Sequence, residues 1–303
     1  MSFKFKMLIL GAEGYLAQAI DFYFQEDYEV KLLSRTDCPI DSDTAVFQAV
    51  EKFDPDIITH CVRDPLLVTD RQTQQAFYET NLVGTLNVVN AAQHVDAEIV
   101  YFTYPLPTPL LPEERHSACR PLCMMPCDLH SAQVKDKSEK FIKSSGLPHY
   151  ILRTGILFGS SGPKVSVSPW LKALMHLILA NETLDVSDSC MLQPLSIGEF
   201  LRALKYCLKI RLHGTYDVMG TDVIAYNELV QLTVDILQLK IKIRETSDDQ
   251  FYKLIQETSS TNLLSTKGLV LKPWRSKYKQ HLLSLQKAGV IDRWRDIIKK
   301  GNI

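Results

Sequence analysis

The chain has 303 residues, of which 46% are hydrophobic and 23% are charged, so its composition is that of an ordinary globular protein and excludes global disorder. Its 34 Lys and Arg nearly balance its 35 Asp and Glu, which excludes a polybasic nucleic-acid binder and gives no electrostatic reason for a membrane partner. No apolar run approaches the roughly 20 residues of a membrane-spanning helix. The seven cysteines are an odd number in a large chain, which favours a reducing, cytoplasmic setting over a disulfide framework.

The first half of the chain alternates short apolar runs with segments of helical periodicity, a pattern typical of an α/β domain with a parallel sheet. The expected strands cover residues 6–10, 29–33, 56–60, 98–102 and 149–153. The expected helices cover residues 15–24, 45–52, 72–93 and 135–145.

The stretch from Tyr104 to Asp128 has a different character. Its many prolines prevent a helix or a central strand, and long loops in compact domains usually have a function. They are Pro105, Pro107, Pro109, Pro112, Pro121 and Pro126.

The same loop contains three cysteines near two histidines, which raises the question of a metal site. The residues are His116, Cys119, Cys123, Cys127 and His130. Zinc sites usually use Cys-x2–4-Cys pairs and four tetrahedral ligands, and the proline-interrupted spacing here fits only loosely. We therefore predict no metal site and a loop that covers a cleft. A cysteine nucleophile activated by His130 or Lys135 is the alternative.

A glycine turn follows the first expected strand. Residues 11–17 read Gly-Ala-Glu-Gly-Tyr-Leu-Ala and lead directly into a helix. Gly11 permits the tight turn, Gly14 lets the backbone approach a pyrophosphate, and Ala17 lets the helix pack closely on the sheet. The amino end of the helix favours phosphate. Because strand, turn, helix and second strand follow in order, the pattern predicts a dinucleotide cofactor rather than an ordinary turn.

The end of the second expected strand favours NADP over NAD. A carboxylate about 20 residues after the glycines usually holds the ribose 2′-hydroxyl of NAD. Here the strand ends in Ser34 and Arg35, and a guanidinium would pair with the 2′-phosphate of NADP. In the alternative, Arg35 is merely solvated and Asp37 or Asp41 holds the ribose.

Further motifs extend along most of the chain. They are Pro55-Asp-Ile-Ile-Thr-His-Cys61, Asn81-Leu-Val-Gly-Thr85, the segment from Ile151 to Gly159, and Asn262-Leu-Leu-Ser-Thr-Lys267 followed by Lys272-Pro-Trp-Arg275. Together with the glycine turn they resemble the extended short-chain dehydrogenase/reductase superfamily, and within it the dTDP-4-dehydrorhamnose reductase-like group.

The resemblance implies a doubly wound parallel sheet of the Rossmann type with a smaller C-terminal lobe that closes over a nucleotide sugar. The NAD(P)-binding domain would comprise residues 1–163 and 189–218, and the substrate lobe residues 164–188 and 219–303. The resemblance also implies an oxidoreductase that can form a homodimer, although the sequence itself indicates no interface. The implied cofactor contacts are Gly11, Gly14, Tyr15, Leu16, Ser34, Arg35, Cys61, Val62, Asn81 and Lys135.

The catalytic residues depart from the family's pattern. The family reduces a carbonyl with a polarising Ser or Thr, a proton-donating Tyr, and a Lys four residues after the Tyr. Lys135 matches that lysine, but Ser131 stands at the tyrosine position. A serine hydroxyl is too weak an acid, and too short, to replace a lysine-activated phenol. Tyr104 stands where the polarising residue is expected, directly after Thr103.

Two functions are compatible with this altered site. In the first, Tyr104 donates the proton, Ser131 or Thr103 polarises the oxygen, and Lys135 orients the ribose and lowers the pKa of the phenol. In the second, the chain is a catalytically silent, cofactor-binding regulatory subunit of a partner enzyme. Both remain open, because fold does not fix function.

Overall fold

The computed structural model describes residues 4–62, 71–103, 129–160, 162, 166–187, 191–246 and 269–300. They form two compact units. The first contains the described residues up to Thr103, those from Leu129 to Arg153, and Ala203 to Asp217. The second contains those from Thr154 to Arg202 and from Val218 onward. Within these ranges, no helix has both the length and the apolar character needed to cross a membrane.

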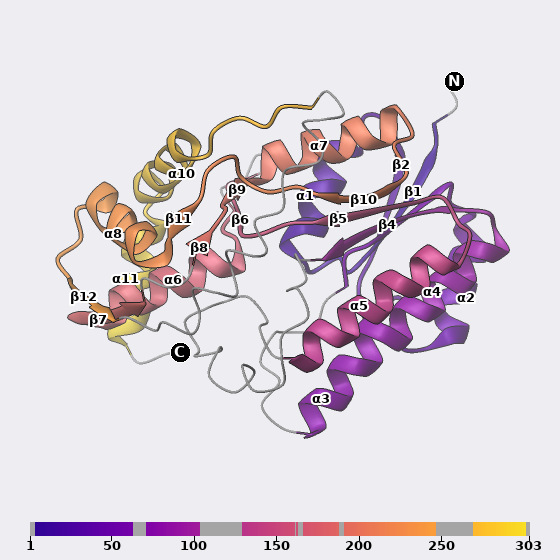
Figure 1. The fold of residues 1–303 in the computed structure, drawn as a ribbon, viewed down its shortest axis with the longest axis horizontal. Coiled ribbons are helices and arrows are strands. Elements are labelled where there is room, and N and C mark those ends of the chain that lie inside the picture. Colours follow the sequence, from indigo (N-terminus) through magenta and orange to yellow (C-terminus); the bar gives the residue numbers. More distant parts are fainter. Residues whose placement is uncertain are drawn as a thin grey trace. The chain divides into compact units, whose positions relative to one another are not determined.

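The first unit contains a six-stranded sheet in the order β10-β5-β4-β3-β1-β2 (Figure 1). All neighbouring strands are parallel. The strands are β1 (Lys6–Leu10), β2 (Glu29–Leu33), β3 (Ile57–His60), β4 (Glu98–Thr103), β5 (His149–Arg153) and β10 (Gly214–Asp217). The predicted doubly wound α/β fold is therefore confirmed.

Helices lie on both faces of this sheet. The helices α2 (Asp43–Phe53), α4 (Gly84–His94) and α5 (Leu129–Ser144) lie together on one side (Figure 1) and pack their apolar residues against β1, β3 and β4. The helix α1 (Tyr15–Phe24) lies on the other side. The end of α7 (Ile197–Lys209) is next to it, because Lys205 pairs with Asp27 at 2.6 Å.

Helical structure covers residues 72–93, as expected, but it includes a π-helical segment. The chain forms α3 (Arg71–Tyr78), the π-helical segment η1 (Glu79–Val83) and then α4 without a break. The Asn81 carbonyl accepts hydroxyl hydrogen bonds from Thr85 at 2.7 Å and from Ser138 at 2.8 Å. Apolar periodicity indicates which face of a helix is buried. It does not indicate where a backbone carbonyl accepts from a side chain on another helix, as that of Asn81 does from Ser138. Periodicity therefore cannot locate a π-helical segment.

The helix expected over residues 135–145 begins earlier, at Leu129. It therefore carries both Ser131 and Lys135, one turn apart, as the resemblance to the reductases requires.

The second unit consists of helices and three two-stranded sheets. The pairs are β6 (Leu157–Phe158) with β9 (Leu195–Ser196), β7 (Thr183–Ser187) with β12 (Lys242–Thr246), and β8 (Met191–Leu192) with β11 (Ile224–Ala225). The remaining helices are α6 (Pro169–Ala180), α8 (Tyr226–Leu237), α10 (Arg275–Lys287) and α11 (Val290–Lys299). The rings of Phe158, Trp274 and Tyr278 meet edge to face in its core. That this unit binds substrate stays a prediction.

Candidate functional site

The glycine turn between β1 and α1 forms a cradle in which a larger residue at Gly11 or Gly14 would be crowded. Gly11 has a φ of +99°, and a Cβ there would lie 3.1 Å from the backbone nitrogen of Val62. A Cβ on Gly14 would lie 3.1 Å from the Gly11 carbonyl oxygen. Gly14 also caps α1 without a side chain, so nothing from this position covers the first N–H groups of the helix. The backbone is thus shaped for close approach by an anionic group.

The turn is fastened to the end of β2. The backbone N–H groups of Gly11 and Ala12 both donate to the Leu33 carbonyl, at 2.9 and 3.0 Å. The next two residues, Ser34 and Arg35, are therefore held beside the cradle. Arg35, which is predicted to bind the 2′-phosphate, therefore lies next to the glycine turn, which is predicted to bind the pyrophosphate.

Ser34 and Asp37 serve the turn after β2. The Asp37 carboxylate accepts from the Ser34 backbone N–H at 3.0 Å and from its hydroxyl at 2.5 Å. These hydrogen bonds hold the pKa of Asp37 below its usual value. Both side chains are thus engaged with each other, and neither lines the adjacent cavity.

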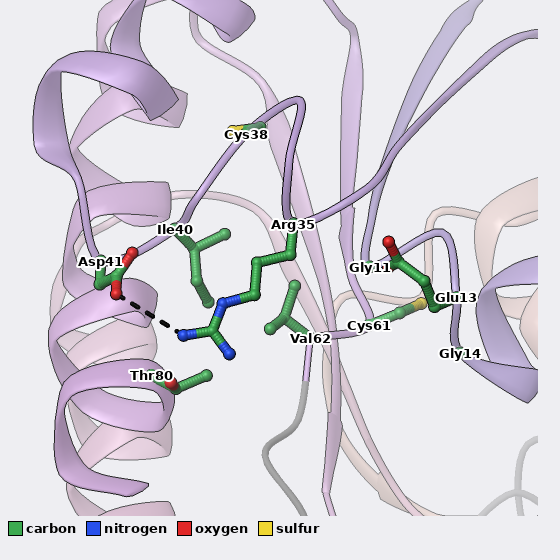
Figure 2. Close-up of a pocket in the computed structure, with 10 residues that line it drawn as sticks. All are labelled: Gly11, Glu13, Gly14, Arg35, Cys38, Ile40, Asp41, Cys61, Val62 and Thr80. Carbon is green, nitrogen blue, oxygen red and sulfur yellow. Dashed lines mark ion pairs between the residues drawn. The ribbon is translucent and has the colours of Figure 1, made fainter. Parts of the chain in front are cut away.

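The cradle opens into a cavity of about 290 Å³, close to the lower end of the usual range for ligand pockets. Figure 2 shows its lining, with the glycine turn on one side, Arg35 and Asp41 on the other, and Val62 and Cys61 between them. Five predicted cofactor contacts therefore lie around one cavity: Gly11, Gly14, Arg35, Cys61 and Val62. Tyr15 and Leu16 begin α1 and are half-buried, outside the lining.

Arg35 extends toward Asp41 across the cavity (Figure 2). Its Nη2 lies 4.0 Å from the Asp41 Oδ2, and the two side chains are 68% and 41% exposed. An ion pair this long and exposed contributes little free energy. The guanidinium is therefore easily diverted to another anion.

The sequence did not predict the apolar wall of this cavity, which Cys38 and Ile40 provide. Both are buried, and the Asn87 amide on α4 donates to the Ile40 carbonyl at 2.9 Å. Burial raises the pKa of the Cys38 thiol to about 11, so it remains a neutral, apolar surface. Glu13 and Thr80 complete the lining. Cys38 and Ile40 lie five and seven positions beyond the end of β2 and belong to no sequence motif. Nothing in the local sequence therefore identifies them as residues that line a cavity.

A second group of polar residues lies at the carboxyl ends of β3 and β4, where they meet η1 and α5. It consists of His60, Asn81, Thr85, Tyr101, Thr103, Lys135 and Ser138, all buried. Among the described residues, Asn81 Oδ1 and Thr103 Oγ1 have no hydrogen-bond partner. Buried polar atoms without a partner are rare and often belong to a functional site.

His60 is neutral, and its hydrogen bonds show which tautomer it adopts. Burial and the nearby charge of Lys135 lower its pKa to about 3. The Thr85 hydroxyl gives its proton to the Asn81 carbonyl, so at 3.1 Å it accepts from the Nε2–H of His60. The Nδ1 atom is then unprotonated, and within the described residues it has no partner.

Lys135 is 1% exposed, which is rare for a lysine. Its Nζ donates to the Tyr101 hydroxyl at 3.3 Å and lies 5.3 Å from the centroid of the same ring. The predicted residues Lys135, Asn81 and Thr103 therefore lie in one buried cluster. The sequence did not identify Tyr101 as part of it.

Several predictions fall outside the described structure. Tyr104 lies beyond the last described residue of β4, and the cysteines of the proline-rich loop lie in the same undescribed segment. Ser131 and His130 belong to α5, but their side chains are not described. Among the described residues, no group of three His, Cys, Asp or Glu could hold a metal ion.

Comparison with protein families decides the family of this chain. Residues 7–186 match the model of the NAD dependent epimerase/dehydratase family, which is more than half of the chain. The chain belongs to this family. Its membership confirms the predicted cofactor class, NAD or NADP, and the predicted resemblance to the extended short-chain dehydrogenase/reductases.

Solved structures support the same fold. A dTDP-4-dehydrorhamnose reductase from Bacillus anthracis in complex with NADP is 21% identical, with a TM-score of 0.73 over 93% of this chain and 98% of that chain. The corresponding enzyme from Clostridium acetobutylicum is 20% identical, with the same TM-score over 93% and 99%. A UDP-glucose 4-epimerase from Thermus thermophilus complexed with NAD is 17% identical, with a TM-score of 0.62 over 80% and 86%. A search of curated proteins finds no significant match.

Proposed function

We propose that the chain binds NADP through its glycine cradle and Arg35, and that it acts on a nucleotide sugar or a similar polar carbonyl metabolite. The observation that carries this proposal is the shared cavity. The backbone turn at Gly11 and Gly14 has room for a phosphate, and the guanidinium of Arg35, whose ion pair with Asp41 is long and exposed, lines the same cavity. Three free cysteines among the described residues support a cytoplasmic protein.

The residues fit this cofactor. Gly11 and Gly14 leave space that a Cβ would fill, so the backbone can take the pyrophosphate. Arg35 can exchange Asp41 for the 2′-phosphate, because a guanidinium binds phosphate in a bidentate manner. Lys135 and Asn81 would hold the nicotinamide end, where the buried amide oxygen of Asn81 has no partner among the residues that the structure describes. When bound, the cofactor supplies or accepts a hydride.

For the proton, we propose Tyr104. Its phenol can serve as a general acid, whereas Ser131 on α5 cannot. Thr103, at the end of β4, has a buried hydroxyl oxygen without a partner among the described residues, so it can polarise a carbonyl oxygen. Ser131 is the second candidate for that role.

The substrate class follows from the family and its neighbours. Besides the reductases, one neighbour is the Bordetella bronchiseptica enzyme WbmG in complex with NAD and UDP. A polar sugar carbonyl requires hydrogen-bond donors beside the hydride position, which Thr103 and Ser131 can provide.

A catalytically silent regulatory subunit is the second candidate. The observation that favours it is the hydrogen bond from Lys135 to Tyr101, because a phenol other than Tyr104 then lies against the lysine. This function predicts that NADP binds without turnover and that the chain alters the rate of a partner enzyme.

Two measurements test the proposal. Calorimetric titration with NADP and NAD should show tighter binding of NADP; failure of both to bind at millimolar concentration would contradict the cofactor assignment. Cofactor oxidation should then be followed with a panel of nucleotide keto-sugars. Binding without turnover on any carbonyl would favour the silent subunit.

A further inference from the structure

We propose that Tyr101 is a positioning residue that holds the ammonium group of Lys135, in place of the tyrosine that is missing from α5. This inference rests on the proposed function, because it assigns a role to the lysine of that same site. The partner phenol has moved from the helix that carries the lysine to the strand that faces it.

The contacts of Lys135 carry the proposal. Its Nζ is 3.3 Å from the Tyr101 hydroxyl and 5.3 Å from the centre of the ring. Both residues are 1% exposed. A buried ammonium needs a partner, because desolvation without one costs several kcal/mol. The phenol meets that need with its oxygen and with the face of its ring.

The surroundings of Tyr101 fix its ring. It belongs to the core that β3, β4 and α4 share, and the ring of His60 lies 5.4 Å away at a tilt of 54°. Tyr101 and Thr103 alternate with Phe102 along β4, so they lie on one face of the strand. Tyr101 is the deeper of the two.

The packing of Tyr101 assigns it a positioning role. A general acid must reach the substrate oxygen, whereas the Tyr101 ring packs in the core cluster and its hydroxyl accepts from Lys135. Burial also raises the pKa of its hydroxyl above the usual value, so it remains protonated and accepts from the lysine. Tyr101 therefore acts through Lys135.

The consequence is a fixed direction for the lysine. An ammonium has three N–H bonds, and the bond given to Tyr101 restricts the directions of the others. Lysine otherwise has a long, flexible stem. A lysine fixed in this way binds cofactor with less loss of conformational entropy.

The test is a double-mutant cycle on the full chain. The variants are Tyr101→Phe, Lys135→Met and the double variant, and the readouts are the Kd for NADP and the free energy of unfolding without cofactor. Tyr150→Phe is the matched control, because Tyr150 is also a fully buried strand tyrosine, but its hydroxyl donates to Glu98 at 2.9 Å.

We expect Tyr101→Phe to weaken NADP binding about five- to twentyfold, and we expect the loss to vanish in the Lys135→Met background. Tyr150→Phe should change the Kd by less than about twofold. Equal losses in both backgrounds would show that Tyr101 acts only on the fold, and would overturn the inference.

The two readouts separate the inference from the proposed function. If Lys135→Met leaves the Kd for NADP unchanged, Lys135 does not bind the cofactor, and that part of the proposed function is wrong. The double-mutant cycle measured on the free energy of unfolding would still show whether Tyr101 and Lys135 interact. Additive unfolding energies would overturn the holding role, whatever the cofactor does.

Discussion

The two ends of the proposed cofactor site are built in different ways. At the glycine end, backbone shape and one exposed ion pair line an open cavity. At the lysine end, His60, Thr85 and Asn81 are enclosed and linked by hydrogen bonds, and the buried Lys135 donates to Tyr101. The first end can recognise a phosphate by itself, whereas the second depends on the packing around it. Mutations at the first end should therefore act mainly on cofactor binding, whereas mutations at the second should act on stability and turnover as well as on binding.

The largest expected effect is on turnover. Tyr104→Phe should lower kcat by about two to four orders of magnitude, because loss of a general acid removes that much, while the Kd for NADP changes little. Cofactor oxidation with a nucleotide keto-sugar measures it. Unchanged turnover in the variant would remove Tyr104 from the mechanism.

The glycine turn should be nearly as sensitive. Gly11→Ala combines a φ of +99° with a Cβ 3.1 Å from the Val62 nitrogen, so we expect NADP binding to weaken about 100-fold and stability to fall by about 1–3 kcal/mol. Gly146→Ala is the control, since Gly146 has a φ of +79° but open space around its Cβ. Gly146→Ala should lower the free energy of unfolding through backbone strain but leave the Kd for NADP unchanged. Equal affinity losses in both variants would contradict the cradle.

A buried carboxylate anchors α5 at the lysine end. Glu139 is 1% exposed and accepts two hydrogen bonds from Arg153, at 3.0 and 2.6 Å. Glu139→Gln should lower the free energy of unfolding by about 2–3 kcal/mol, because Arg153 loses its charged partner. The exposed Asp136–Lys140 pair on the same helix provides the control, and Asp136→Asn should cost less than about 0.5 kcal/mol in urea unfolding. Equal costs would mean that burial does not matter at this helix.

The ion pair at the glycine end should control the choice of cofactor. Arg35→Ala should weaken NADP binding about tenfold or more and leave NAD nearly unchanged, because only NADP carries the 2′-phosphate. Asp41→Asn removes the competing carboxylate and should strengthen NADP binding by about twofold. Calorimetry with both cofactors at two salt concentrations measures this. A parallel loss for NAD would mean that Arg35 does not read the 2′-position.

A further effect concerns pH. His60 has a pKa lowered to about 3, whereas an unfolded histidine titrates near 6.5. Between these values the unfolded state binds more protons, so stability falls as pH decreases, by up to about 1.4 kcal/mol per pH unit. Urea unfolding at pH 7.5, 6 and 5 should show a shallower slope in His60→Gln. Burial lowers the pKa of His281 to about 4, so His281 should still contribute to the pH dependence of stability in this variant. An unchanged slope in His60→Gln would show that His60 titrates alike in the folded and unfolded states, so that burial does not lower its pKa.

Much of the fold could be predicted because its determinants are local. The strands β1, β2 and β5 begin and end at the predicted residues, since a buried parallel strand is a short apolar run between turns. The glycine turn was equally visible, because a positive φ is confined almost entirely to glycine. The helix over residues 72–93 was predicted, but its π-helical segment was not, because there the Asn81 carbonyl accepts from Ser138 on α5, a residue distant in the sequence.

The sequence by itself predicted five strands of the sheet, the glycine turn and the place of Arg35 after the second strand, because each follows from residues adjacent in the chain. Only the tertiary structure brought Tyr101 to Lys135 across 34 positions and His60 to Thr85 across 25. The physical reason is burial. A lone lysine or histidine in a sequence does not show which neighbour will satisfy its hydrogen bonds once water is excluded, and that neighbour is chosen by how strands and helices pack.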